Sequence, residues 1–191
     1  NSTGTVVNNG TILANTAAQT FSIGPSRFIN AGLVNATAGV LNVSPYYATV
    51  GTVLAPFAND GSLIVNGATV NITPASTHGW SNAGTLDVRS GTLNLGGRFT
   101  TAELAVPHLA RSGGTINVTS SGTLNLLGGT LDIGGGGLFG TGGLGTLSSG
   151  TLANGTLTSG DGTALLSSSG VLDTVTILNS GTQAFGMSGS G

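Results

Sequence analysis

One nine-residue stretch decides the fold that we predict for this chain: residues 80–88, with the sequence Trp-Ser-Asn-Ala-Gly-Thr-Leu-Asp-Val. An aromatic residue comes first, Asn follows two positions later and Gly two positions after that, and aliphatic residues then alternate with polar ones. The same phrase occurs at residues 57–65 and, less regularly, at residues 28–34. An earlier copy begins at Val6 and a degenerate one at Ala110, so the copies start about 22, 29, 23 and 30 residues apart. A period of this size is typical of a solenoid.

Short segments with period-two alternation accompany these copies. Seven triplets place Asn or Asp between two aliphatic residues, at positions 41–43, 70–72, 86–88, 93–95, 116–118, 124–126 and 131–133. Because side chains alternate between the two faces of a strand, the aliphatic residues are expected inside and the Asn and Asp residues outside, in ladders. We therefore predict a buried set, Leu86, Val88, Leu93, Leu95, Ile116, Val118, Leu124 and Leu126, and an outward set, Asn94, Asn117 and Asn125. Phe28, Phe57 and Trp80 should form one aromatic stack.

The spacing between triplets selects the type of solenoid. Triplets that begin at Leu86 and Leu93, or at Leu124 and Leu131, lie about seven residues apart, which fits a three-residue strand and a Gly-containing corner. Hairpins would need Asn-Gly or Asp-Gly turns between longer strands. Corners that bend the chain by less than a reversal instead wind it into coils of about 20–25 residues that pair in parallel about 4.8 Å apart. Gly at those corners supplies positive φ. The sequence predicts an all-β chain folded as a single-stranded parallel β-helix, or β-solenoid.

The repeat also predicts how the chain is organised. Residues 1–133 should form regular coils with excursions near residues 44–56 and 96–113. Residues 134–191 should be a Gly-rich continuation of the same solenoid. Neither end offers a helix, a charge cluster or a proline as a cap, so we expect further coils beyond both ends or contact with other subunits.

Composition excludes several classes of function. The chain has no Cys, four Arg and no Lys, six carboxylates and a formal net charge of −2. Charged residues make up only 5% of the chain, which leaves no polybasic surface for nucleic acid or for anionic lipid. The sequence has no apolar run of the roughly 18 residues that would cross a membrane. We predict no nucleic-acid partner, no membrane insertion in this segment, and no disulfide or thiolate-bound metal.

The phrase aromatic-x-Asn-x-Gly-x-aliphatic, together with Gly-Thr-Leu-Asn-Leu at residues 91–95, resembles repeats of bacterial filamentous-haemagglutinin-type adhesins and autotransporter passenger domains. The resemblance covers about residues 6–133, and Gly-Thr-Leu runs continue to about residue 177. It implies a right-handed β-helix that is secreted or displayed on the bacterial cell surface, for adhesion, biofilm building or an extracellular filament. Its implied partners are further copies of itself and host or matrix glycans or proteins. The Asn-Pro-Asn motifs of the family's secretion domain do not occur, which indicates a piece of the shaft or a divergent relative.

A carbohydrate-active β-helix enzyme, either a polysaccharide lyase or a hydrolase, is the main alternative. Asp87 and Asp132 occupy equivalent places in their triplets and could share a face, about two coils or 10 Å apart, at or beyond the limit for an inverting pair. His78 and His108 have no Ser or Asp partner nearby in the sequence. We therefore predict no catalytic residue, no metal, no cofactor and no enzymatic activity. A third alternative, ice binding, would need a regular flat row of Thr-x-Thr, which the isolated copies at residues 156–158 and 174–176 do not provide.

Two further motifs match known patterns only in part. Residues 140–145 fit G-x-G-x-x-G, but a dinucleotide site needs a helix after the glycines, and a Ser- and Gly-rich run follows here. Residues 128–133 are similar to a calcium-binding nonapeptide, yet they lack the Gly two positions before the Asp and do not repeat. Neither motif predicts a ligand site.

The two excursions carry the candidate binding residues. Residues 98–111 contain half of the arginines, the one Glu and one of the two histidines, so we predict a protruding loop that contributes to recognition. The alternative is a structural insertion that covers an apolar seam. Tyr46 and Tyr47 mark the other excursion, since exposed tyrosines suit contacts with sugars or proteins. The predicted binding residues are Tyr46, Tyr47, Arg98, Glu103, His108 and Arg111.

Overall fold

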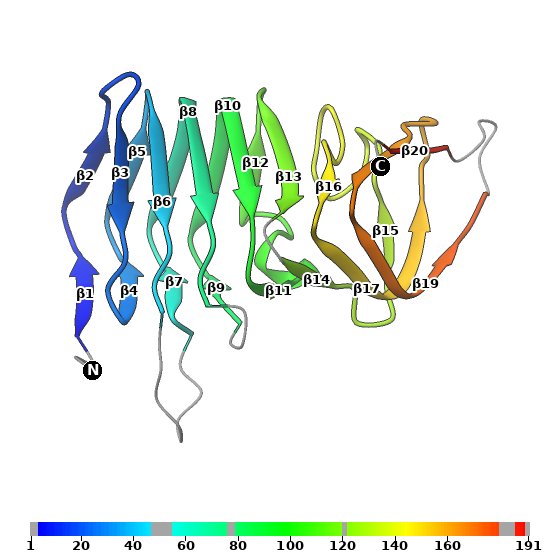
Figure 1. Cartoon of the computed structure of the whole chain (residues 1–191), viewed down its shortest axis with the longest axis horizontal. Helices are drawn as coiled ribbons and strands as arrows, with labels where there is room; N and C mark the ends of the chain where they lie inside the picture. The colour runs from blue at the N-terminus through cyan, green and yellow to red at the C-terminus, as the bar shows by residue number, and fades with distance from the viewer. Residues whose placement is uncertain (1–3, 47–54, 76–78, 120–121, 180–185, 190–191) are drawn as a thin grey trace.

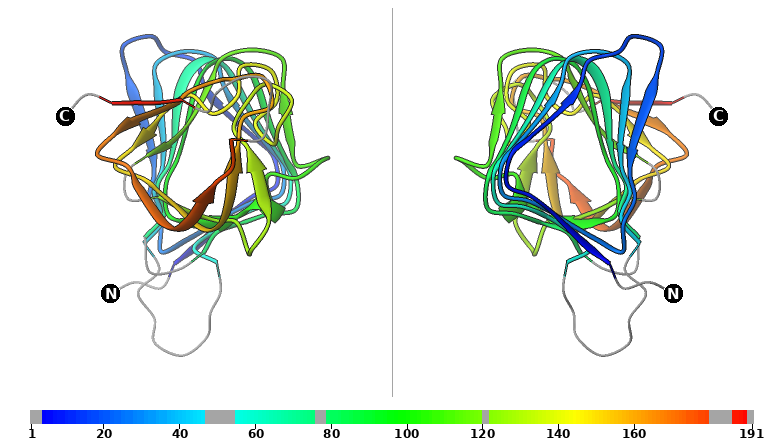
Figure 2. Two further views of the ribbon diagram at one scale, coloured as in Figure 1. Left: turned by 90° about the vertical axis from the view of Figure 1, so that its right-hand side faces the viewer. Right: turned by 90° about the vertical axis from the view of Figure 1, so that its left-hand side faces the viewer.

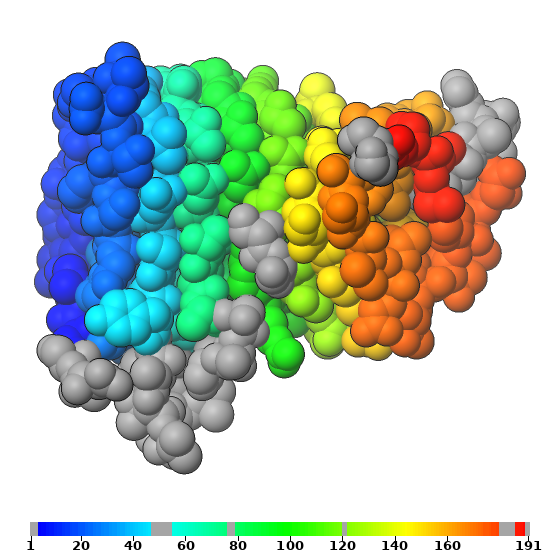
Figure 3. Space-filling view, in the orientation of Figure 1, coloured from blue at the N-terminus to red at the C-terminus, as the bar shows by residue number. Residues whose placement is uncertain are grey.

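The chain winds into a right-handed β-solenoid. The computed structural model describes residues 4–46, 55–75, 79–119, 122–179 and 186–189. About seven turns of roughly 23 residues each are stacked along one axis, as successive bands of colour in Figures 1 and 3. Viewed from the N-terminal coil, the chain turns clockwise as it recedes from the viewer (Figure 2). The predicted all-β parallel β-helix is confirmed.

Three parallel sheets form the walls of the solenoid. Sheet A contains β1 (Thr5–Asn8), β4 (Arg27–Asn30), β7 (Phe57–Asn59) and β9 (Ser81–Asn82). Sheet B contains β2 (Thr11–Ala14), β3 (Thr20–Ile23), β5 (Leu33–Ala36), β6 (Val40–Val43), β8 (Ser62–Ile72), β10 (Thr85–Leu95), β12 (Leu109–Arg111), β13 (Thr115–Thr119), β16 (Leu147–Ser148), β18 (Leu165–Ser168) and β20 (Met187–Gly189). Sheet C contains β11 (Arg98–Thr100), β14 (Thr123–Asn125), β15 (Thr130–Asp132), β17 (Thr151–Thr158) and β19 (Val171–Ile177). A single 3-10 turn, η1 (Thr101–Glu103), is the one helical element of the described residues, in which no helix is long and apolar enough to span a bilayer.

Strand register places equivalent triplets one above another. Leu93 of β10 pairs with Val70 of β8 and with Ile116 of β13, so their side chains stack in the interior. All eight residues of the predicted buried set are at most 2% exposed, as period-two alternation requires. The predicted interior is confirmed.

Two members of the outward set, Asn94 and Asn117, form the predicted ladder. Asn94 Nδ2 donates to Asn71 Oδ1 at 2.7 Å, and Asn117 Nδ2 donates to Asn94 Oδ1 at 2.8 Å. Asn71 continues the ladder to Asn42 at 2.8 Å. Asn125 is half-buried on sheet C, where its Oδ1 accepts a hydrogen bond from the backbone of Leu127.

The asparagines of the repeat phrase lie inside the solenoid, so the prediction that all Asn ladders run up the outside is wrong for them. Asn30 and Asn59 are fully buried, and each Nδ2 donates to the next asparagine at 2.7 Å, ending at Asn82. The reason is the same period-two rule: Asn59 stands two positions after Phe57 on one strand, so both side chains face inward.

The glycines of the phrase also differ from expectation. Gly61 and Gly84 are not among the glycines with positive φ, although Gly91 and Gly114 before the next strands are. A Cβ on Gly84 would lie 1.9 Å from the carbonyl oxygen of Gly61 in the preceding coil. Glycine is required there because the two backbones approach each other closely.

The aromatic residues stack along the inner corner as predicted. The ring centroids of Phe28 and Phe57 are 6.0 Å apart with nearly parallel planes, and those of Phe57 and Trp80 are 6.1 Å apart. Phe99 extends the stack, with its centroid 5.0 Å from that of Trp80. The predicted stack of three is confirmed and has a fourth member from outside the phrase.

The prediction of a fifth, degenerate copy of the phrase beginning at Ala110 is wrong. In that copy Ile116 would be equivalent to Leu86, but Leu86 pairs with Leu109, and Ile116 pairs with Leu93. Residues 98–108 therefore replace the phrase in this coil, and Gly114 corresponds to Gly91.

Candidate functional site

Residues 98–108 form an insertion at the junction between sheets A and C. Arg98 pairs with Gly79, and the backbone N–H of Trp80 donates to Arg98 O at 3.0 Å. Phe99 and Leu104 are buried in the core, whereas Val106 is 91% exposed. The expected protruding loop is thus confined to the turn around Val106, because the two apolar side chains anchor the rest of the insertion.

The insertion ends the inner asparagine ladder. Asn82 Nδ2 donates to the carbonyl oxygens of Glu103 at 2.8 Å and His108 at 3.2 Å, which replace the asparagine of a further copy. The Glu103 carboxylate accepts from Thr100 N–H at 2.8 Å and from its hydroxyl at 2.6 Å, in a capping box around η1. His108 Nδ1 lies 2.9 Å from Gly84 O, and since a carbonyl only accepts, the ring donates there. Glu103 and His108 therefore hold the insertion in place.

Arg111 is a clamp between two coils. Its guanidinium donates to the carbonyl oxygens of Phe139 at 3.2 Å and Gly143 at 2.7 Å, and also to Gly113 and Gly114. Burial lowers the pKa of Arg111 below its usual value. These bonds fix the Gly-rich residues 134–143, whose Phe139 side chain is fully buried in the core.

The remaining predicted binding residues have different surroundings. Tyr46 is exposed, and its backbone N–H donates to Pro25 O at 3.1 Å. Tyr47 and His78 lie outside the described residues. Arg98 is exposed at the edge of β11. Within the described part of the chain, no hydrogen bond or ion pair engages its guanidinium.

Arg98 stands at one end of a groove of about 660 Å³ over sheet C, which sequence reasoning missed. Consecutive strands β11, β14, β17 and β19 contribute its walls and floor. The lining residues that project polar groups are Arg98, Thr100, Glu103, Thr123, Asn125, Thr151, Asn154 and Asp173. They are spread over 76 positions of sequence, and only the coil register brings them together.

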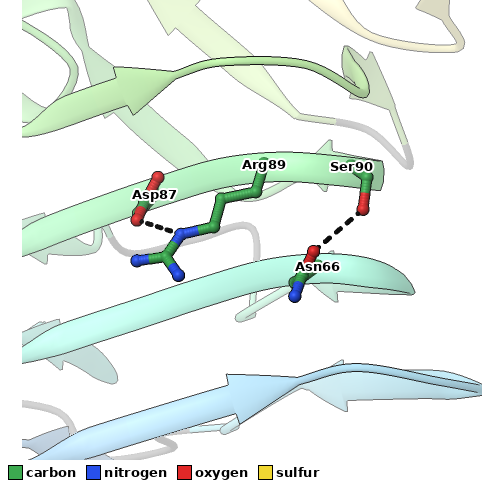
Figure 4. Close-up of polar contacts among 4 residues, drawn as sticks. All are labelled: Asn66, Asp87, Arg89 and Ser90. Atoms are coloured by element: carbon green, nitrogen blue, oxygen red, sulfur yellow. Dashed lines mark hydrogen bonds and ion pairs between the residues drawn. The ribbon is translucent and has the colours of Figure 1, made fainter.

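The carboxylates considered for catalysis do not share a face. Asp87 lies on β10 in sheet B, where it forms an ion pair with Arg89 at 2.8 Å (Figure 4). On the same strand, Ser90 donates to Asn66 of the preceding coil at 3.1 Å. Asp132 lies on β15 in sheet C. The shared face that was considered for Asp87 and Asp132 does not occur, because their triplets occupy different sides of the coil.

Two aspartates organise the corners of the C-terminal coils. Asp132 Oδ1 accepts from the backbone of Gly134 and Gly160, at 2.8 and 3.1 Å. The Asp161 carboxylate accepts hydrogen bonds from Thr163 and from the backbone N–H of Gly135. These hydrogen bonds hold the pKa of its carboxyl well below the usual range. Among the described residues, no group of three or more His, Asp or Glu side chains is placed to hold a metal ion.

Comparisons with protein-family models, curated proteins and solved structures found no match for this chain. The fold defines its class: a right-handed parallel β-solenoid with stacked aromatic and asparagine ladders.

Proposed function

We propose that this chain is a structural and adhesive segment of a secreted or cell-surface bacterial protein, a length of adhesin shaft or of an extracellular filament. The observation that supports it best is the coil-on-coil repetition of the fold. The coils that contain β4, β7 and β9 are joined to one another by backbone hydrogen bonds, by hydrogen bonds between inner asparagines and by stacked aromatic rings. Coils repeated in this way form a stiff rod, and the rod lengthens as coils are added. The resemblance of the repeat phrase to bacterial adhesin repeats points to the same role.

The use made of the charged residues supports a mechanical role. Three of the residues first considered for recognition, Glu103, His108 and Arg111, hold backbone groups of neighbouring segments. Asp132 and Asp161 do the same at the C-terminal corners. These side chains stabilise the rod and leave few charged groups for chemistry.

Self-association is part of the proposal. The first and last described coils leave inward-facing apolar side chains uncovered, including Phe21 at 46% and Met187 at 62% exposure. Exposed strand edges are templates for further pairing. A further coil, from the same chain or from another copy, would cover both the side chains and the backbone edge.

Sedimentation velocity and electron microscopy of the isolated 191-residue chain test this proposal. We expect concentration-dependent association into end-to-end particles, which Phe21→Asp should suppress by placing a charge in the open coil. Thr92→Asp, on the outer face of β10, is the matched control and should leave association unchanged. A monodisperse monomer at high concentration and neutral pH would overturn the self-association.

Enzymatic activity is the function to be excluded. We expect no cleavage of polygalacturonate or alginate by the purified chain, since its candidate carboxylates, Asp87 and Asp132, lie on different sheets. Turnover that disappears in Asp87→Asn or in Asp132→Asn would establish an enzyme in place of a shaft.

A further inference from the structure

The geometry of the groove over sheet C points to a binding site for a neutral oligosaccharide of about three sugar units. This site lies on the side of the solenoid and needs no association between copies, so it goes beyond the structural role proposed above.

The shape of the groove suits a short linear ligand. It spans four successive strands, and at about 4.8 Å between coils the distance from β11 to β19 is about 14 Å. Its volume of about 660 Å³ lies within the range of roughly 300–1,000 Å³ that is common for small-molecule sites. A chain of a few sugars laid along the solenoid axis would cross all four strands.

Two rows of outward positions run along the groove. Register places Arg98, Thr123, Thr151 and Val171 in the first row, and Thr100, Asn125, Ala153 and Asp173 in the second. A guanidinium, an amide and a carboxylate each present two donors or acceptors in one plane, and a threonine hydroxyl can do either. Such groups match adjacent hydroxyls of a sugar ring, which both donate and accept.

Arg98 and Asp173, on the first and last strands of the groove, are available to a ligand. Arg27, Arg89 and Arg111 all donate to protein oxygens, whereas the Arg98 guanidinium has no partner within the described ranges. Asp173 accepts one hydrogen bond, from the neighbouring Thr174 hydroxyl at 3.1 Å. Both ends of the groove therefore carry a charged group with hydrogen-bonding capacity that the described residues leave unused.

The floor of the groove offers a small apolar surface. Ala153 is buried in the second row, and Val171 is exposed in the first row on the next strand. Sugar rings have C–H faces, and apolar side chains between polar ones are the usual composition of a ligand site. The combination of planar polar groups and a narrow apolar floor favours a saccharide.

Charge and backbone pairing decide between ligand classes. The groove contains one cation, Arg98, and two carboxylates, Glu103 and Asp173, so a neutral ligand avoids repulsion better than an anionic one. An extended peptide would gain most of its affinity from an unpaired strand edge. The floor strands β14 and β17 are paired on both sides, which leaves no such edge there.

Trp80 gives an indirect readout, because it is the only tryptophan of the chain and its buried ring packs against Phe99 of the groove strand β11. We expect titration with maltotriose, cellotriose or mannotriose to change its fluorescence saturably.

Arg98→Ala and Asp173→Ala should each weaken binding about tenfold, the loss of one charge-assisted hydrogen bond. Thr151→Phe, which fills the groove, should abolish it. Arg89→Ala and Thr92→Phe, outward-facing changes on sheet B, are the matched controls and should bind like the unmodified chain.

Three results would overturn the site: no saturable response to any of the trisaccharides, equal binding by Arg98→Ala, Asp173→Ala and the controls, or saturable binding of an uncharged Gly-Ser peptide without binding of the sugars. The titration is performed at a protein concentration where sedimentation shows a monomer. Sugar binding and end-to-end association are then measured separately, and either can fail without the other.

Discussion

Single residues of the repeat phrase are fixed by contact with their equivalents one coil away. Gly84 approaches the backbone of Gly61, and Gly61 approaches that of Gly32 in the same manner. Other corners take left-handed φ without glycine: Asn154 at 56° and Thr174 at 55°, in neighbouring coils of sheet C. Stacking of equivalent corners thus imposes one backbone conformation on different residue types, even on β-branched Thr174, for which left-handed φ is unfavourable.

A Gly84→Ala substitution tests the close approach. Its Cβ would collide with the Gly61 carbonyl, so we expect the free energy of unfolding to fall by about 2–3 kcal/mol. Gly10→Ala is the matched control, because a Cβ at this equivalent position in the first coil meets nothing within 4 Å. Urea unfolding followed by circular dichroism measures both. Equal losses would show that backbone entropy, rather than the collision, dominates.

The inner asparagine ladder gives a second residue-scale prediction. Asn59→Ala would remove the acceptor of one of the two Asn30 Nδ2 hydrogen bonds and the donor to Asn82 Oδ1 in a buried site, which should lower the free energy of unfolding by about 2–4 kcal/mol. Asn94→Ala removes the same amide group from the outer ladder, where water can replace the amide. This variant should lower the free energy of unfolding by about 1 kcal/mol or less. Chemical denaturation compares the two variants. A larger loss for Asn94→Ala would contradict the inward placement of Asn59.

At the scale of elements, the insertion of residues 98–108 redirects the solenoid. Sheet A stops at β9 in the described part of the chain, and sheet C begins at β11, whose Phe99 continues the aromatic stack. Strand β12 then resumes pairing with the first half of β10. The insertion therefore links an N-terminal half formed by sheets A and B to a C-terminal half formed by sheets B and C. Sheet B and the core continue through both halves.

Arg111 holds the second half of the Gly-rich segment after β15. Arg111→Met removes the hydrogen bonds to Phe139 and Gly143, each charge-assisted and worth about 1.5–3 kcal/mol. We expect at least about tenfold faster hydrogen exchange and proteolysis within residues 134–143, with other coils unchanged. Arg89→Met, which removes an exposed ion pair with Asp87, is the control and should change stability by less than about 0.5 kcal/mol. Unchanged exchange in Arg111→Met would show that packing of Phe139 and the aspartate bonds to Gly134 and Gly135 hold the segment without Arg111.

At the scale of the whole molecule, stability should follow position along the axis. The central strands β8 and β10 pair along most of their length and have neighbours on both sides, while β1 and β19 each pair with a single strand within the described residues. In a linear array, each coil is stabilised mainly by the coils that it contacts. We expect hydrogen exchange to be slowest in β8 and β10 and fastest in β1, β19 and β20, as measured by mass spectrometry on dilute monomer. Uniform protection would indicate that the array unfolds as one unit.

The sequence by itself determined the coil. Period-two alternation identified the buried leucines, the outer asparagine ladder and the aromatic stack, because these depend on local geometry that repeats in every turn. The same rule also placed Asn59 inside, two positions from Phe57, although the expectation that polar ladders face water obscured it. The degenerate copy at residues 110–118 was assigned wrongly because a Gly-Thr-aliphatic run precedes each of the two strand segments of a coil. The local pattern therefore does not tell one strand segment from the other.

Only the tertiary structure decided which distant residues meet. The sequence marked Arg98 and Arg111 as alike, yet Arg111 is bound by carbonyl oxygens 28 and 32 positions away, while Arg98 opens onto a groove made with Asp173. Asp87 and Asp132 occupy equivalent triplets but different sheets, since the insertion changes how many residues each coil uses. Register between coils depends on the lengths of the corners and insertions and on packing of the core. Every residue of a turn contributes to these properties. A local pattern therefore fixes which side of a strand faces inward, but not which residues lie beside it.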